Sequence, residues 1–120
     1  MTDLIELAER VERAPGPDRE LDCLIAQHLG YQKLARGVTA AEIAHLYPGP
    51  FYTASLDAAL KLATGTVLLH LSDIGADGLP LCRLGDPSTG REWTGIAATL
   101  PLAITAAALR ARAAATTEGE

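Results

Sequence analysis

The chain has 120 residues and a formal net charge of −5, with 48% apolar and 4% aromatic residues. This length can bury the core of one domain without metal or disulfide bonds, and the acidic balance without a basic run excludes duplex nucleic acid as the expected partner. No apolar stretch reaches the roughly 18 residues of a membrane span, so we expect a cytoplasmic protein that does not bind membranes.

Two amphipathic helices are predicted at the start of the chain. Over residues 2–13 the acidic side chains, Glu12 among them, are expected on a solvated face. Pro17 suits the first turn of a second helix, which Gly30 would end. The apolar stripe of the first helix recurs every three or four positions: Leu4, Leu7, Ala8 and Val11.

The next segment carries weaker signals and then a third helix. Residues 31–37 read equally as a short strand or a loop. A capping-box pattern, Thr39-Ala40-Ala41-Glu42, predicts a short helix over residues 39–46. A further helix is predicted over 53–63, with Thr53 or Ser55 as its cap.

Three β-strands are predicted over residues 66–72, 80–84 and 91–97. The first strand is apolar at consecutive positions, which predicts cover on both faces. Short turns join the strands, so they should pair antiparallel as a meander. The fold class that follows is α/β (α+β): a three- or four-stranded, mostly antiparallel sheet with helices on both faces.

A last helix is predicted after Thr99, which would cap it. Nothing apolar continues its stripe beyond Ala113, so the chain should form one domain over 1–113 with a flexible tail over 114–120. The stripe consists of Leu102, Ala106, Leu109 and Ala113.

No catalytic or metal-binding signature is present. The three histidines fall in separate predicted elements without HExxH spacing, and no phosphate-binding glycine loop occurs. Cys23 and Cys82 also fall in different elements, as expected for buried thiols in a reducing compartment. We therefore expect a protein that is not an enzyme and that needs no cofactor or metal.

A small anion or nucleotide is a candidate ligand. Arg91 and Trp93 lie two apart in one strand and therefore share a face, which Arg83 would join if the register allowed. Charge for a phosphate beside a ring for a base suits a nucleotide. The alternative is that Arg91 pairs with a carboxylate and Trp93 belongs to the core. Helix N-termini would add backbone donors at Thr53, Ser55 and Thr99.

The last helix also carries more alanine than one core contact uses. A symmetric homo-oligomer would bury this surface, although alanine is also the best helix former. The residues concerned are Ala103, Ala106, Ala107, Ala111 and Ala114.

Three segments, residues 16–26, 52–60 and 99–111, together resemble the phage ABA-sandwich domain family. The resemblance implies helices on both faces of a central sheet and a phage accessory protein in the host cytoplasm, without known catalytic residues. Such a protein would antagonise host defence by sequestering a nucleotide second messenger or similar small anion. The alternative is a protein that docks on a host defence protein or phage protein through its helical surface.

Overall fold

The computed structural model describes residues 4–28, 52–63, 65–75 and 78–118. The short helix predicted over 39–46 and the ambiguous residues 31–37 lie outside these ranges. In chain order the elements are α1 (Leu4–Arg13), α2 (Arg19–His28), α4 (Leu56–Leu62), β1 (Val67–Ser72), β2 (Leu81–Gly85), β3 (Glu92–Ile96) and α5 (Leu100–Glu118).

The first two helices confirm the sequence prediction. The α1 stripe is buried at every predicted position, because those residues share one face of the helix. Asp18 caps α2, since its carboxylate accepts hydrogen bonds from the backbone N–H groups of Glu20 (2.9 Å) and Leu21 (3.2 Å). Helix α1 packs on both α2 and α5.

The three strands form an antiparallel meander in the order β1-β2-β3. The predicted α+β fold with a three-stranded antiparallel sheet is therefore confirmed. One bulge interrupts the pairing of β1 with β2 between Leu68 and His70, so that Leu69 is the additional residue.

Helix α5 is the centre of the molecule, in contact with α1, α4, β2 and β3. All of its residues from 102 to 109 are buried, not only the predicted stripe. The helix runs to Glu118, beyond Ala113 where a tail was predicted to begin. Its backbone lies so close to β3 that a Cβ added at Gly95 would overlap the carbonyl oxygen of Ala103 and lie 2.8 Å from the Ala107 nitrogen.

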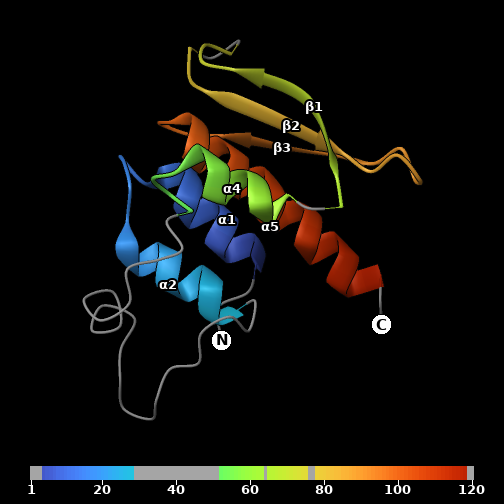
Figure 1. Ribbon diagram of the computed structural model, residues 1–120, viewed down its shortest axis with the longest axis horizontal. Coiled ribbons are helices and arrows are strands. Elements are labelled where there is room, and N and C mark those ends of the chain that lie inside the picture. Colours follow the sequence, from blue (N-terminus) through green and yellow to red (C-terminus); the bar gives the residue numbers. More distant parts are fainter. Residues whose placement is uncertain (1–3, 29–51, 64, 76–77, 119–120) are drawn as a thin grey trace.

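The described helices lie together on one side of the sheet, and β1 is the strand farthest from them (Figure 1). Packing between helices and sheet runs through β2 and β3. The prediction that the first strand is covered on both faces is wrong: Val67, Leu68 and Leu69 are 43%, 48% and 48% exposed. Only Leu71 of this strand packs against the core. None of the described helices combines the length and apolar character that a membrane span requires.

Candidate functional site

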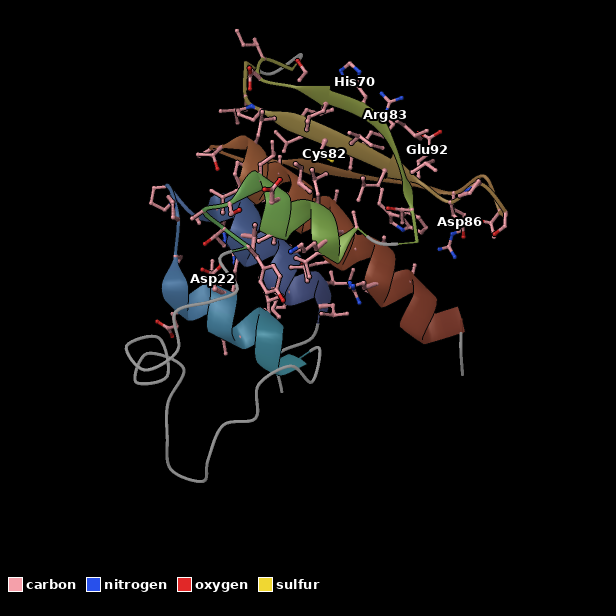
Figure 2. The ribbon with its side chains drawn as sticks, in the orientation of Figure 1. Asp22, His70, Cys82, Arg83, Asp86 and Glu92 are labelled. Atoms are coloured by element: carbon pink, nitrogen blue, oxygen red, sulfur yellow. The ribbon has the colours of Figure 1, made fainter. Side chains whose placement is uncertain are left out.

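The register of the strands sorts their side chains onto two faces. Trp93 pairs with Leu84 and Gly95 with Cys82, and these residues face α5. Neighbouring residues point the other way, because side chains alternate along a strand. Figure 2 shows His70, Arg83 and Glu92 on the side away from the helices, and Cys82 on the helix side. We call the uncovered side the open face: Val67, Leu69, His70, Leu81, Arg83, Glu92, Thr94 and Ile96.

One ion pair crosses the middle of the open face. The Arg83 Nε lies 3.7 Å from a Glu92 carboxylate oxygen, and about half of each side chain is exposed. The stabilisation expected from such an exposed pair is small, up to about 1 kcal/mol. Leu69 lies over Gly85, because its Cδ1 atom would be only 2.7 Å from a Cβ at that position. The open face therefore combines a central ion pair with apolar residues along β1.

The strongest surface signal is an apolar hairpin, formed by β1, β2 and the described residues between them, 73–75 and 78–80. Five of the eight exposed large hydrophobic residues in the described part of the chain lie on it. Large apolar side chains that gather exposed in one part of a protein often mark an interaction site. The five residues are Val67, Leu68, Leu69, Ile74 and Leu79.

The two edges of the sheet differ. At the β3 edge, Glu12 of α1 accepts a hydrogen bond from the Ile96 N–H (2.9 Å), and Arg110 of α5 donates one to the Thr94 carbonyl (2.7 Å). Arg110 also donates to the Glu12 carboxylate (2.8 Å). Helix side chains thus occupy backbone groups of β3 that another strand would need.

These contacts change the protonation of Glu12. Desolvation raises the pKa of this carboxyl, but hydrogen bonds from Arg110 and the Ile96 N–H, with the charge of Arg110, outweigh it and lower the pKa below the ordinary value. The pKa of Arg110 is raised, chiefly by its hydrogen bond to Glu12. Both groups therefore stay charged at neutral pH, and the closure of the β3 edge persists there.

The β1 edge has no comparable closure among the described residues. Backbone groups of alternate residues in an antiparallel strand point to opposite sides. The backbone N–H and C=O groups of Thr94 and Ile96 point away from β2, so those of Trp93 and Gly95 bond to β2. The backbone groups of Arg83, which pairs with Thr94, therefore point towards β1. The backbone groups of His70, the partner of Arg83, therefore point towards β2. Those of Leu68 and Leu71 point outward, away from the sheet.

The structure brings together two of the predicted ligand residues and separates the third. The guanidinium carbon of Arg91 lies 5.7 Å from the centroid of the Trp93 ring, within cation–π range. Arg83 pairs with Thr94 in the register, so its side chain lies on the open face, opposite to Trp93. The expectation that Arg83 joins the other two is wrong, because adjacent register positions alternate between faces.

The predicted helix-terminus donors serve the fold. Thr53 is buried, donates its N–H and hydroxyl to Asp22 (2.8 and 2.9 Å), and accepts a hydrogen bond from the Asp18 N–H (2.8 Å). Ser55 caps α4 by accepting from Ala58, and the Thr99 hydroxyl accepts from Leu102 at the start of α5. The Arg91–Trp93 pair, Thr53, Ser55 and Thr99 thus belong to four separate local arrangements.

The remaining chemical candidates are also accounted for in the fold. Burial raises the pKa of the Cys82 thiol to about 11, so almost no nucleophilic thiolate forms at neutral pH. No cluster of three or more potential metal ligands occurs within the described ranges. Ala103, Ala106 and Ala107 are fully buried and Ala111 nearly so, because α5 is central, so these residues offer no surface for self-association.

Sequence reasoning missed the apolar hairpin as a surface. An apolar run reads alike whether it is covered by the chain itself or left exposed for a partner. One signal was available: no Lys or Arg occurs between Gly65 and Cys82, although charged residues usually protect an edge strand.

The comparisons with known proteins add no relative. No protein-family model, no curated protein and no solved structure matches this chain.

Proposed function

We propose that the chain is a protein-binding module whose partner adds an extended segment to β1. The observation that carries the proposal is the apolar hairpin, whose first strand exposes nearly half of Val67, Leu68 and Leu69. Strand addition supplies backbone hydrogen bonds for affinity and side-chain contacts on both faces.

The difference between the two edges supports β1 as the docking strand. Glu12 and Arg110 occupy backbone groups of β3, so a partner strand meets resistance there. On β1, the outward backbone groups of Leu68 and Leu71 have no described partner, and no charged residue lies in the strand. Proteins normally blunt such an edge with Lys, Pro or a covering segment.

Backbone NMR of the labelled chain with synthetic extended peptides tests this function. Uncharged peptides rich in Val, Ile and Thr should shift the amides of Leu68 and Leu71 most, while their Lys-substituted counterparts should bind at least about tenfold more weakly. Leu68→Lys should abolish the shifts. Leu60→Lys adds the same charge at an exposed leucine of α4 and should leave them unchanged.

Two results would count against strand addition. One is a set of peptides that leaves the β1 amides unmoved at millimolar concentration. The other is a set of shifts centred on β3 or on the helices instead of β1.

A second candidate function is nucleotide or anion binding at Arg91 and Trp93. The observation that favours it is the 5.7 Å cation–π contact at the β3 end of the sheet, where Arg91 is exposed. Trp93 is the only tryptophan, so its fluorescence reports directly on a base that stacks there. Cyclic nucleotides should quench this fluorescence and release or absorb heat in calorimetry, and Arg91→Ala should remove both effects. Neither signal at protein concentrations well above micromolar would end this candidate.

A further inference from the structure

We propose that the segment added to β1 is β1 of a second copy of this chain. Two copies would then form one continuous six-stranded antiparallel sheet, since each contributes the three strands β1-β2-β3. A two-fold axis would relate them, as in most homodimers. This inference rests on the proposed function of β1 as a docking strand and names its occupant.

Charge favours an identical partner. Each copy carries a net charge of −5, so two copies repel each other over most approaches. The strand Val67–Ser72 contains no Asp, Glu, Lys or Arg. When it pairs with itself, no register can place like charges opposite each other. Two acidic copies therefore repel each other least when they approach through this uncharged strand.

The bulge of β1 favours an identical partner more specifically. Leu68 and Leu71 are the two residues whose backbone N–H and C=O groups point outward. The bulge separates them by three positions, whereas such residues lie two positions apart in a regular strand. A regular strand, whose outward backbone groups recur every two residues, can hold register with only one of these two residues at a time. A second β1 in antiparallel orientation has the same spacing, so Leu68 can pair with Leu71 of the second copy and Leu71 with its Leu68.

The size of the surface sets the expected strength. The five exposed large hydrophobic residues of the apolar hairpin are far fewer than the roughly 20–30 residues per partner of a standard stable interface. The outward backbone groups of Leu68 and Leu71 would add hydrogen bonds. We therefore expect a reversible dimer with a dissociation constant in the micromolar range.

Analytical ultracentrifugation of the full chain from ~1 to ~500 µM spans that range. The average mass of the native chain should rise towards twice the 12.6 kDa of one copy. Leu68→Lys should weaken the dimer at least about tenfold, because two like charges then lie at the pairing strand. Leu60→Lys on α4 is the matched control and should dimerise as the native chain does.

Hydrogen exchange of the unsubstituted chain provides a test that needs no variant. The amides of Leu68 and Leu71 should gain protection as the protein concentration rises over the same range. The amides of His70 and Ser72 already face β2 and should change little. This contrast identifies the pairing edge as well as the oligomeric state.

Three outcomes would overturn the second copy as occupant: a chain that stays monomeric to the highest concentration, a Leu60→Lys variant that loses the dimer as fully as Leu68→Lys, or Leu68 and Leu71 amides protected equally at all concentrations in a monomer. If uncharged peptides nevertheless shift the β1 amides, the docking function stands without the dimer. If neither peptides nor a second copy act on β1, both proposals fail.

Discussion

At the scale of single residues, Glu12 does more than its sequence position suggests. The sequence placed it on the solvated face of the first helix. In the structure only 23% of its side chain is exposed, and its carboxylate contacts both Arg110 and the Ile96 N–H. These partners are 98 and 84 positions away, so no local pattern could have predicted the contact. One carboxylate thus ties α1 to α5 and to the edge of β3.

Glu12→Gln should destabilise the fold by about 2 kcal/mol, because it leaves the charge of a mostly buried Arg110 without its ion-pair partner. The free energy of unfolding from urea titration at pH 7 measures the effect. Glu9→Gln removes the same charge from an exposed position one turn earlier and should cost no more than about 0.5 kcal/mol. Equal losses in the two variants would show that the pairing with Arg110 is not what stabilises.

The same carboxylate predicts a pH dependence. Its folded-state pKa is lowered from the ordinary 4.5, so its stabilisation is fully present above that value and is lost as the pH falls through the lowered folded-state pKa. The stability difference between the native chain and Glu12→Gln should be constant above about pH 5.5 and shrink towards acid. Urea titrations of both proteins from about pH 2.5 to 7 give this difference. A difference that stays constant into acid would refute the assignment.

At the scale of elements, the sequence predicts the helices and strands well but not their cover. Cap residues, apolar periodicity and turn residues indicate local conformation, and most described elements agree with them to within a few residues. The neighbours of an element depend on contacts far along the chain. The burial of residues 102–109 of α5 had a readable cause, since all of them are apolar except Thr105. The only sequence feature that indicated the exposure of β1 was the lack of Lys and Arg between Gly65 and Cys82.

Gly95→Ala should destabilise the fold by about 3 kcal/mol or more, because the new methyl group would meet the backbone of α5, which cannot rotate away as a side chain can. Chemical unfolding measures the loss. Gly16→Ala is the control: nothing lies within 4 Å of a Cβ there, so its stability should stay within about 1 kcal/mol of the native value. A Gly95→Ala protein as stable as the control would show that α5 does not lie so close to β3.

At the scale of the whole molecule, the described elements differ in how many other elements they contact. Helix α5 contacts α1, α4, β2 and β3, whereas β1 depends mainly on β2. The sequence could indicate that a sheet and helices exist, since composition and periodicity report that. It could not indicate that the helices gather on one side, because the same amphipathic stripes satisfy either arrangement.

These contacts predict that the backbone amides of α5 and β1 differ in their protection from hydrogen exchange in the monomer. At protein concentrations well below micromolar, the amides of α5 between 102 and 109 should exchange only through global unfolding, because every residue there is buried. The β1 amides bonded to β2, such as His70, should exchange through local opening at a free energy at least about 2 kcal/mol lower. Mass spectrometry of pulse-labelled peptides measures both. Equal protection of the two elements would contradict the prediction that β1 opens locally before α5 does.

The asymmetry between the sheet edges also governs what lies beyond a pair. A protein with two available edges can recruit copies end after end and elongate into a fibre. Here Glu12 and Arg110 occupy the β3 edge, so growth through β1 would stop once two copies had paired. Removing that carboxylate would therefore endanger solubility as well as fold, because each molecule would then offer two sites for strand-by-strand aggregation.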